Sequence, residues 1–443
     1  MTVGPRLRRT AFWALDASRG SPIRNHLNDI RSKMEGDAAP EERLEPLLDH
    51  AIRTTPFYAR SAGPHIESFP VTTKQMFRSR FTEFLSSTSA GANLHYLQTS
   101  GTSGAPLTIG QSADKRRRSI ADTIYFNETF GQLVGDRLLW LRAWPPQLAK
   151  PRHVRLAQNI VPFEVRGMDD GVKEAIVRTL NGRKVNAMLG YSTALRALAR
   201  FIEERGYDAH AFGLRVIIND SEAMHLTAKR RLEAVFGCSV VDRYANVENG
   251  ILAATAPGDD LLTLNRASCW FEFLKLEADE PEVPGRPARV VVTDLYNYAM
   301  PIIRYDTGDL AVVADHGGRH ATTLERIEGR RADVIYDTAG HQVSESVALW
   351  MMYEFHDILE YQLVQEGPSE YHLYVAGADD ASRAGDFVAT LQDTLGHDAR
   401  ISIDFVESIP RDKGGKARAL VCNYVPRRSG AETEPHEVDE ANG

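Results

Sequence analysis

The spacing of apolar residues changes along the chain and separates regions of different predicted structure. Over the first hundred residues apolar positions recur at helical spacing, as in PEERLEPLLDHAIRTTPFY at residues 40–58, so this region is predicted to be mainly helical. From about residue 185 short apolar runs typical of strands (VNAML, LRVIIN and SVVDRY) alternate with the helical patterns STALRALARFIEERG and TAKRRLEAVFG. That alternation predicts a parallel sheet whose strands are joined by crossover helices.

Residues that favour helix ends refine these boundaries. In VTTKQMFRSRFTEFL, Thr72 or Thr73 is predicted to cap the N-terminus of a helix. Ser192 is predicted to cap a later helix, which Gly206 ends. The segment RPARVVVTDL, residues 286–295, predicts a further strand.

The alternation stops near residue 326, after which the pattern predicts a second structural unit. A charged, glycine-containing connection leads to ESVALWMMYEFHDI (helix), YHLYV (strand), RAGDFVATLQDTL (helix) and RISIDFV (strand), an α+β unit of about 100 residues. We therefore predict an α/β protein with a large N-terminal domain of mostly parallel sheets at residues 1–327 and a small α+β C-terminal domain at residues 328–425. The polar tail at residues 426–443 is predicted to be disordered.

Composition and charge argue against some classes of protein and favour others. The net charge of −8 and the pI near 6.0 give no support to nucleic-acid binding. The densest basic run, residues 115–118, is interpreted as a solvated helix face. Three cysteines far apart in sequence argue against a disulfide framework and favour a reducing compartment. No apolar run approaches the ~18 residues of a membrane span and the N-terminus is a poor signal peptide, so we expect a cytoplasmic protein with no membrane or nucleic-acid partner.

Residues 99–106 form the most unusual local composition, because every one of them is Thr, Ser, Gly, Ala or Pro. Backbone amides can approach an anion closely only where side chains are small, and glycines supply the turns that aim successive N–H groups inward. The segment TSGTSG therefore suits a polyphosphate cradle, and a flexible surface loop is the alternative. It is not a Walker loop, because no Gly-Lys-Ser/Thr follows.

Four further positions carry side chains suited to nucleotide chemistry. Asp309 follows a tight Thr-Gly turn, where a carboxylate could accept hydrogen bonds from two ribose hydroxyls; an ordinary turn is the alternative. Glu248 follows a predicted strand and could hold Mg²⁺, or could simply begin a helix. Arg330 lies in the connection between the two predicted domains. Lys416 follows two glycines near the chain end, where a solvated turn lysine is the plainer interpretation.

In this order and spacing, the motifs resemble those of the adenylate-forming enzymes, the superfamily of acyl-CoA and aryl-CoA synthetases. The branch that they resemble most is that of the phenylacetate–CoA ligase-like proteins. The resemblance covers about residues 50–425 and includes FPVTTKQMFR ahead of the loop, Gly190-Tyr191 before a helix, Glu222 after a short strand, then RYANVENG and RYDTGDL. Any one of these motifs is weak, whereas all of them in the right order are specific.

The resemblance implies roles for individual residues of this chain. Tyr244 corresponds to the aromatic residue near adenine, Asp309 to the ribose-binding aspartate and Glu248 to the glutamate that holds Mg²⁺. Glu222 is placed in the same nucleotide-binding set. The loop that embraces the β- and γ-phosphates of ATP corresponds to Thr99, Ser100, Gly101, Thr102, Ser103 and Gly104.

Two more residues are assigned to the change between half-reactions. Arg330 corresponds to the arginine at the hinge, and Lys416 to the lysine that swings in for adenylation on the small, mobile C-terminal domain. The sequence departs from the pattern at Val247, where relatives carry a Thr or Ser that contacts the α-phosphate, and Asn246 is the candidate to replace it. It departs again at Ala332, where the hinge of relatives carries an acidic residue.

These assignments predict an AMP-forming acid–thiol ligase that uses ATP and Mg²⁺ and acts on a small-molecule carboxylic acid. The carboxylate attacks the α-phosphorus of ATP to give an acyl-adenylate and pyrophosphate, and a thiol such as that of coenzyme A then takes the acyl group. Trp140, Trp144, Tyr125 and Phe126 could line the pocket of an aryl or arylacetic acid, or could pack in the core.

Three other functions are compatible with parts of the sequence. The activated group could pass to an amine, a carrier protein or another nucleophile instead of coenzyme A. Val247 and Ala332 could mark an inactive homologue that binds nucleotide without turnover. LGYSTA nearly matches the G-x-S-x-G elbow of an α/β-hydrolase with Ser192 as nucleophile, but that function leaves the ATP-type motifs unexplained.

Overall fold

The computed structural model describes most of the chain. The predicted helix ESVALWMMYEFHDI and the tail from residue 426 lie outside the described part. The described residues are 4–36, 41–98, 107–144, 150–166, 168–220, 224, 226–314, 321–330, 335–340, 342–343, 360–376, 384–409 and 420–424.

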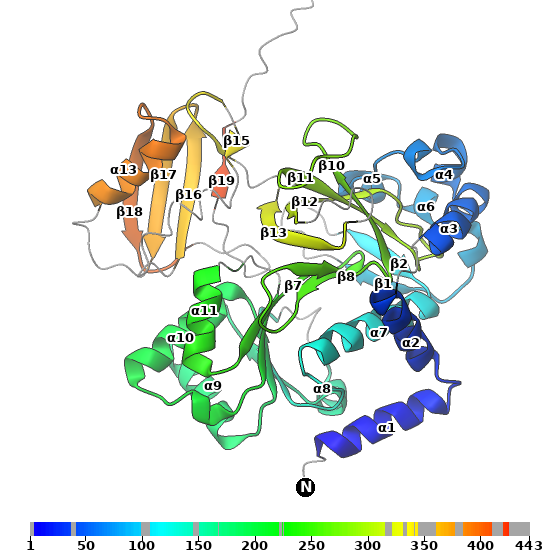
Figure 1. The fold of residues 1–443 in the computed structure, drawn as a ribbon, viewed down its shortest axis with the longest axis horizontal. Helices are drawn as coiled ribbons and strands as arrows, with labels where there is room; N and C mark the ends of the chain where they lie inside the picture. Colours follow the sequence, from blue (N-terminus) through cyan, green and yellow to red (C-terminus); the bar gives the residue numbers. More distant parts are fainter. Residues whose placement is uncertain are drawn as a thin grey trace, which may run out of the picture.

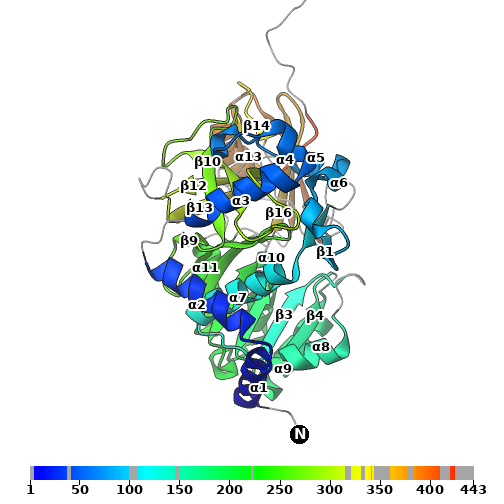
Figure 2. The ribbon, with the colours of Figure 1, turned by 90° about the vertical axis from the view of Figure 1, so that its right-hand side faces the viewer.

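The N-terminal region is mainly helical, as its apolar spacing predicts. Figure 2, which faces the right-hand side of Figure 1, shows α3 and α4 in front of the large sheet, and Figure 1 shows that they lie on the side away from β13. An antiparallel pair of short strands, β1 and β2, follows these helices. The elements are α1 (Pro5–Ala17), α2 (Pro22–Glu35), α3 (Glu41–Thr54), α4 (Pro56–Ser61), α5 (Lys74–Ser79), α6 (Phe81–Phe84), β1 (His95–Gln98) and β2 (Thr108–Gln111).

Helix α5 is short and begins where the sequence predicts. Thr73 caps it, because its Oγ1 accepts a hydrogen bond of 3.4 Å from the Met76 amide. Of the two predicted candidates, Thr73 is therefore the cap, while Thr72 makes backbone contacts that are described below. The predicted helix is interrupted at Arg80, after which α6 begins.

One large sheet organises residues 138–330. Its eleven strands have the order β10-β11-β12-β13-β9-β8-β7-β6-β5-β3-β4. The pairs from β4 to β7 are parallel, which confirms the predicted strand–helix alternation. The pairs from β7 to β10 are antiparallel, so mostly parallel pairing holds for only one half of the sheet. The strands are β3 (Leu138–Arg142), β4 (Ile160–Glu164), β5 (Ala187–Gly190), β6 (Val216–Asp220), β7 (Ser239–Asn246), β8 (Gly250–Thr255), β9 (Leu262–Leu264), β10 (Cys269–Leu274), β11 (Pro287–Asp294), β12 (Tyr305–Val313) and β13 (Thr323–Arg330).

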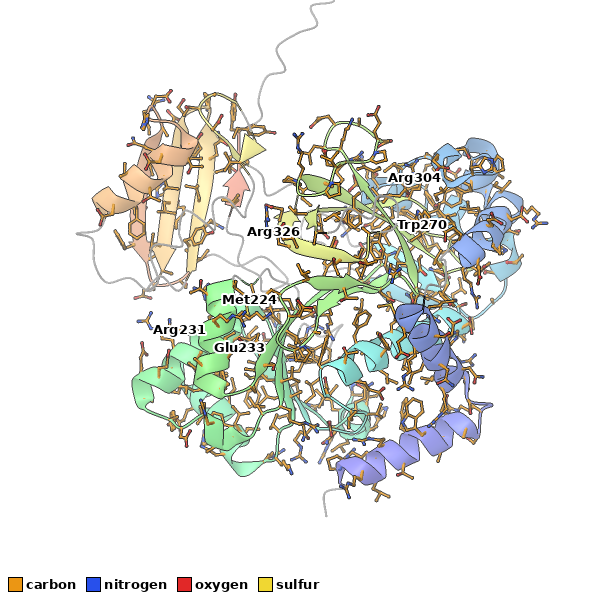
Figure 3. The ribbon with its side chains drawn as sticks, in the orientation of Figure 1. Met224, Arg231, Glu233, Trp270, Arg304 and Arg326 are labelled. Carbon is orange, nitrogen blue, oxygen red and sulfur yellow. The ribbon has the colours of Figure 1, made fainter. Side chains whose placement is uncertain are left out.

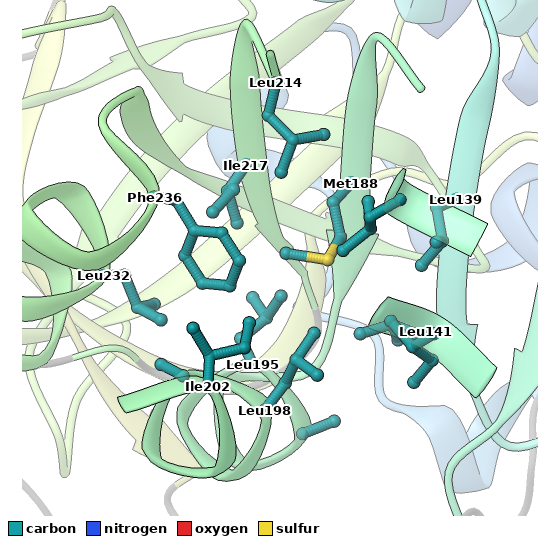
Figure 4. Close-up of a cluster of buried hydrophobic side chains, with 14 of the residues drawn as sticks. Leu139, Leu141, Met188, Leu195, Leu198, Ile202, Leu214, Ile217, Leu232 and Phe236 are labelled. Carbon is teal, nitrogen blue, oxygen red and sulfur yellow. The ribbon is translucent and has the colours of Figure 1, made fainter. Parts of the chain in front are cut away.

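Helices cover both faces of the parallel half (Figure 1). The strands alternate their side chains between the two faces. Met188 and Ile217 pack in the cluster beneath α10 and α11, as Figure 4 shows. Their strand neighbours Leu189 and Ile218 pack with Phe126 of α7 on the opposite face. The helices are α7 (Ala113–Thr129), α8 (Arg152–Gln158), α9 (Asp170–Gly182), α10 (Ser192–Arg205) and α11 (Leu226–Phe236).

Helix α10 ends as predicted but begins differently. Gly206 stops it in the left-handed conformation at φ 68°. Ser192 is the first helical residue, and Tyr191 holds the cap position without a capping hydrogen bond from its side chain. The predicted capping role of Ser192 is therefore wrong: the strand runs so directly into the helix that the cap falls one residue earlier.

The basic run at residues 115–118 is not the solvated face that its composition suggested. Lys115 and Arg118 of α7 are fully buried. The Lys115 ammonium lies 2.6 Å from a carboxylate oxygen of Asp294, and the Arg118 guanidinium contacts the Asp29 carboxylate. Residues three apart share one face of a helix, and both anionic partners come from segments that are distant in sequence. The local pattern therefore could not reveal this burial.

A second sheet of four strands, in the order β18-β17-β16-β19, lies beyond β13 (Figure 1). The predicted strands YHLYV and RISIDFV and the predicted helix RAGDFVATLQDTL are confirmed, and apolar residues of that helix pack on the sheet. The division into domains at residue 327 stays a prediction, and β13 itself continues to Arg330. The elements are β14 (Ile335–Tyr336), β15 (Gln342–Val343), β16 (Glu360–Gly367), β17 (Glu370–Ala376), α13 (Ala384–Leu395), β18 (Arg400–Val406) and β19 (Leu420–Cys422).

Among the helices of the described residues, none combines the length and the apolar character that crossing a membrane requires.

Candidate active site

Glu248 lies in a tight turn between two strands of the large sheet. β7 ends at Asn246, and β8 begins at Gly250, whose φ is 98°. The Asn246 side-chain Oδ1 accepts a hydrogen bond of 2.7 Å from the Asn249 amide, and this bond closes the turn. The sequence NVENG therefore places a carboxylate at the tip of a fixed turn, and the Glu248 side chain is buried there.

Two residues from distant segments contact the Glu248 carboxylate. The Tyr305 hydroxyl donates a hydrogen bond of 3.0 Å to Oε1, and the Lys74 ammonium lies 3.7 Å from the same oxygen. Burial, together with the negative charge of Glu248, raises the pKa of Tyr305, so its hydroxyl stays protonated and can donate. Both of these contacts are made at the same carboxylate oxygen, Oε1.

The segment that leads to Lys74 is fixed to the start of β12. The Thr72 amide donates to the Arg304 carbonyl at 2.8 Å, and the Asp306 amide donates to the Thr72 carbonyl at 2.9 Å. Thr72 thereby forms a parallel bridge with Tyr305. The motifs FPVTTKQMFR and RYDTGDL, which are far apart in sequence, thus form one structural unit.

Arg304 holds this junction in an unusual backbone conformation. Its φ of 47° lies in the left-handed region, which is costly for a residue with a side chain. Its buried guanidinium donates to both carboxylate oxygens of Glu272 at 3.1 Å and to the Phe69 carbonyl at 2.8 Å (Figure 3). Burial raises the pKa of Glu272, and the charge of Arg304 opposes that rise. Arg304 therefore ties β10, β12 and the segment before α5 together.

Asp309 lies in β12, close to the end of β7. Tyr244, on β7, donates its hydroxyl to Asp309 Oδ2 at 2.7 Å. Burial, and then the negative charge of Asp309, raise the pKa of Tyr244 well above its ordinary value, so Tyr244 acts as a donor. Gly308 bends the strand at φ 80°, and the Asp309 amide donates to Thr307 Oγ1 at 3.1 Å. Across the β12–β13 pair, Asp309 lies opposite Arg330.

The structure brings several predicted site positions together, and their roles stay predictions. Glu248 and the Asn246 amide lie in the turn after β7, Tyr244 contacts Asp309, and the backbone of Arg330 lies beside Asp309. The other predicted positions lie outside the described residues or side chains: Thr99, Ser100, Gly101, Thr102, Ser103, Gly104, Glu222, Lys416 and the side chain of Arg330.

The two strands on either side of the predicted phosphate loop pair with each other and are attached to the large sheet's connecting segment. β1 and β2 pair antiparallel, with Gln98 opposite Thr108. The buried Asn297 amide donates a hydrogen bond of 3.1 Å to the Gly110 carbonyl, which attaches the pair to the segment between β11 and β12. The two segments that flank residues 99–106 are therefore held side by side, and their strand pair is attached to the segment between β11 and β12.

Sequence reasoning missed two side chains of this site. Lys74 belongs to FPVTTKQMFR, which served only as a family motif, although a lysine directly after the Thr73 cap is a usable signal. Tyr305 immediately precedes the predicted ribose-binding segment, and only the fold shows that its hydroxyl reaches Glu248.

The environment of Glu248 suits a magnesium ligand. Mg²⁺ takes one or two carboxylates and fills its remaining positions with waters and substrate phosphates. Glu248 offers a buried carboxylate, and its contacts with Tyr305 and Lys74 described above are both at Oε1. Val247 beside it is 40% exposed and has no hydroxyl to offer a phosphate. Within the described ranges, no group of three or more His, Cys, Asp or Glu could hold a metal.

Known proteins are similar to this chain over much of its length. Residues 335–423 match the family model of the CapK C-terminal domain. The chain is 22% identical to protein CapK of Staphylococcus aureus over 407 residues, which cover 86% of this chain and 88% of that protein. It is 24% identical to the phenylacetate–coenzyme A ligase of Escherichia coli strain K12 over 337 residues, 68% of this chain and 72% of that protein.

Solved structures have the same fold. A 2-hydroxyisobutyryl-CoA ligase in the postadenylation state, in complex with R3-HIB-AMP, gives a TM-score of 0.69 at 18% identity, over 86% of this chain and 88% of that one. The same ligase in the thioesterification state, with 2-HIB-AMP and CoA, gives 0.52 at 19% identity over 86% and 88%. The fold is that of the adenylate-forming CoA ligases, and phenylacetate–CoA ligases and CapK are homologues of this chain. The resemblance and the α/β fold that the motifs predicted are confirmed.

Proposed function

We propose that the chain uses ATP to activate a carboxylic acid as its acyl-adenylate, releases pyrophosphate, and transfers the acyl group to a thiol such as that of coenzyme A. One observation carries the proposal: Glu248, with Lys74 and Tyr305 on one of its oxygens, lies at the same sheet edge as the Tyr244–Asp309 pair. Homology to phenylacetate–CoA ligases and the fold of a CoA ligase support it.

In this proposal the nucleotide lies along the carboxyl ends of the parallel strands, where ligands bind in open α/β sheets. Asp309 accepts the ribose hydroxyls, and the hydroxyl of Tyr244 fixes the orientation of that carboxylate while its ring borders the adenine. The loop at residues 99–104 and Glu222 complete the nucleotide site. Glu248 holds Mg²⁺, which would offset charge on the phosphates.

The first half-reaction forms one bond and breaks another at the α-phosphorus. A carboxylate oxygen of the acid attacks this phosphorus, and the bond to the β-phosphate oxygen breaks, so pyrophosphate leaves with the electron pair. The donors act mainly by position and charge. Lys74 and Lys416 are the cations that we assign to the developing charge, and Asn246 replaces the hydroxyl that Val247 lacks through its amide.

In the second half-reaction a thiol attacks the mixed anhydride and AMP leaves. We propose that residues 328–425 form a C-terminal domain that rotates about Arg330 between the two steps. Arg330 lies directly beside Asp309 in the sheet register, so a hinge there would couple the domain movement to the nucleotide site.

An aryl or arylacetic acid is the substrate class that we propose. Trp140 and Trp144 pack edge to face with their ring centroids 5.1 Å apart, and Arg142 lies over both rings at 5.3 and 5.4 Å. These half-buried rings remain candidates for the pocket wall. Phe126 is buried in the core cluster of the sheet, and we assign it to packing.

Pyrophosphate release with a panel of carboxylic acids, measured with and without coenzyme A, tests this function. We expect release with a subset of acids and a thioester product when coenzyme A is present. Adenylate formation without thioester, followed by transfer to an added amine or carrier protein, would support the alternative acceptor. Absence of both pyrophosphate release and pyrophosphate–ATP exchange with every acid would contradict the proposal.

The role of Lys416 has its own test. Lys416→Ala is expected to slow adenylation by at least about a hundredfold, because a cation at the transition state is lost, and to spare thioester formation from a supplied adenylate. Adenylation at the full rate in this variant would overturn the assignment of Lys416 and leave the reaction class standing.

A further inference from the structure

Arg78 lies one helical turn after Lys74, and part of its guanidinium is buried without a partner. Its Nε and Nη2 atoms are inaccessible to solvent, and neither donates a hydrogen bond within the described part of the chain. A buried charged donor that lacks an acceptor destabilises the folded protein. Proteins keep such groups where an absent ligand supplies the acceptor.

The face of α5 that carries Arg78 is turned toward Glu248. Residues three and four apart share one side of a helix, so Lys74, Phe77 and Arg78 lie on one side of α5. Phe77 packs edge to face on Tyr305 with ring centroids 5.7 Å apart, and Lys74 lies 3.7 Å from Glu248 Oε1. Arg78 therefore lies on the same side of α5 as Lys74, which contacts the predicted metal ligand.

In contrast to Arg78, a neighbouring arginine has hydrogen-bond acceptors for its guanidinium. Arg80, just beyond α5, donates to both carboxylate oxygens of Glu83 at 2.9 and 2.8 Å and is exposed. The segment therefore provides acidic partners on its outer side. On the inner side, Lys74 lies 3.7 Å from the carboxylate of Glu248, whereas Arg78 forms no ion pair with a carboxylate of the described residues.

We propose that Arg78 binds the terminal phosphates of the nucleotide, the β- and γ-phosphates that leave as pyrophosphate. The proposal rests on the proposed function, which places the metal-bound phosphates at Glu248. A helical turn rises about 5.4 Å, so Arg78 lies about one turn farther along α5 than Lys74. The planar guanidinium fork matches two phosphate oxygens, whereas Lys74 supplies a point charge. Arg78 thus contacts ATP and pyrophosphate and makes no contact with AMP.

Equilibrium binding of three ligands to wild type and to Arg78→Ala tests this assignment. With Mg²⁺ present and no acid, calorimetry gives the Kd of ATP, of inorganic pyrophosphate and of AMP. We expect Arg78→Ala to raise the Kd of ATP and of pyrophosphate about tenfold or more and to leave that of AMP unchanged. An equal loss for AMP, or no loss for ATP and pyrophosphate, would overturn the proposal.

Two further variants keep the result interpretable. Arg80→Ala, the matched control, removes a nearby exposed arginine and should leave all three Kd values unchanged. Arg78→Lys keeps the charge but loses the fork, so it should weaken ATP and pyrophosphate by a smaller factor and again spare AMP; this variant decides the case if Arg78→Ala fails to fold. Wild type that binds no nucleotide would overturn the proposed function itself.

Discussion

Two helices of this protein turn cations toward the interior, and they differ in how those charges are balanced. On α7, Lys115 and Arg118 are fully enclosed, and each contacts a carboxylate from a distant segment, Asp294 or Asp29. Buried pairs of this kind are essential to the fold once present, because removing one partner leaves the other charge buried alone. The cations of α7 therefore belong to the scaffold.

On α5 the balance is incomplete. Lys74 has the carboxylate of Glu248 at 3.7 Å, but that oxygen also accepts the Tyr305 hydroxyl, and Arg78 buries two nitrogen atoms without an acceptor in the described chain. The comparison teaches that a buried basic residue indicates function only when some of its donor atoms lack an acceptor within the fold. A count of basic residues along the sequence would give the opposite ranking, since α7 has the denser run.

The largest expected effect is the loss of stability when a buried cation of α7 is removed. Lys115→Met should lower the free energy of unfolding by about 3–5 kcal/mol, because Asp294 would remain buried without its partner. Urea unfolding measures the change, and Arg117→Ala, at an exposed position of the same run, should cost less than about 0.5 kcal/mol. Equal losses in the two variants would remove the distinction between the buried and exposed cations of α7.

On the α5 side, Glu248→Gln should slow pyrophosphate–ATP exchange by about a hundredfold or more with little change in stability. The substitution keeps the size and the hydrogen bond from Tyr305 but removes the charge that faces Lys74 and that we propose holds Mg²⁺. Exchange kinetics and urea unfolding should be measured on the same preparations. A large loss of stability with unchanged exchange would show that Glu248 belongs to the scaffold, as Asp294 does.

Lys74→Ala is expected to have a smaller effect on the same reaction. Loss of one charge-assisted contact corresponds to about 1.5–3 kcal/mol, or roughly a ten- to hundredfold drop in exchange rate. Because the side chain is about one-third exposed, the unfolding free energy should hardly change, in contrast to Lys115→Met. If Lys74→Ala unfolds at a much lower urea concentration than wild type, the contrast between the cations of α5 and those of α7 is wrong.

The smallest effect concerns pH. Hydrogen bonds from Tyr296, Arg118 and Lys33 outweigh burial and lower the pKa of Asp29 to about 2 from its ordinary 3.8. The unfolded chain therefore binds this proton more readily, so the stabilisation is complete above about pH 4 and is lost as pH falls toward 2. Asp29→Asn should reduce stability by about 1 kcal/mol at pH 7, and this difference should shrink at pH 2. A difference that is independent of pH would contradict this role of Asp29.

Much of the fold was predictable because its signals are local. The apolar runs of β5 and β6, the helical spacing of α10 and the stop at Gly206 each lie within one short window. The site was partly predictable for a related reason. Strand ends in a parallel sheet meet at one edge, so the turn after β7 had to carry Glu248 toward the ligand side.

The rest of the fold and of the site depends on contacts between residues that are far apart in the sequence, which no short stretch of sequence contains. The burial of Lys115 requires Asp294, and the approach of Lys74 to Glu248 requires Thr72 to bridge the start of β12. The antiparallel half of the sheet escaped prediction because its hairpins have no helices between them to mark each strand. The left-handed backbone conformation of Arg304 accompanies its ion pair with Glu272, and no local sequence pattern predicts that pair.

A crystal structure with Mg²⁺ and a non-hydrolysable ATP analogue would test most directly whether Lys74 and Arg78 of α5 bind phosphate. The triphosphate should lie between α5 and the turn after β7, with phosphate oxygens within hydrogen-bond distance of Lys74 and Arg78 and the ribose on Asp309. A nucleotide bound elsewhere, or one whose terminal phosphates point away from α5, would contradict that claim.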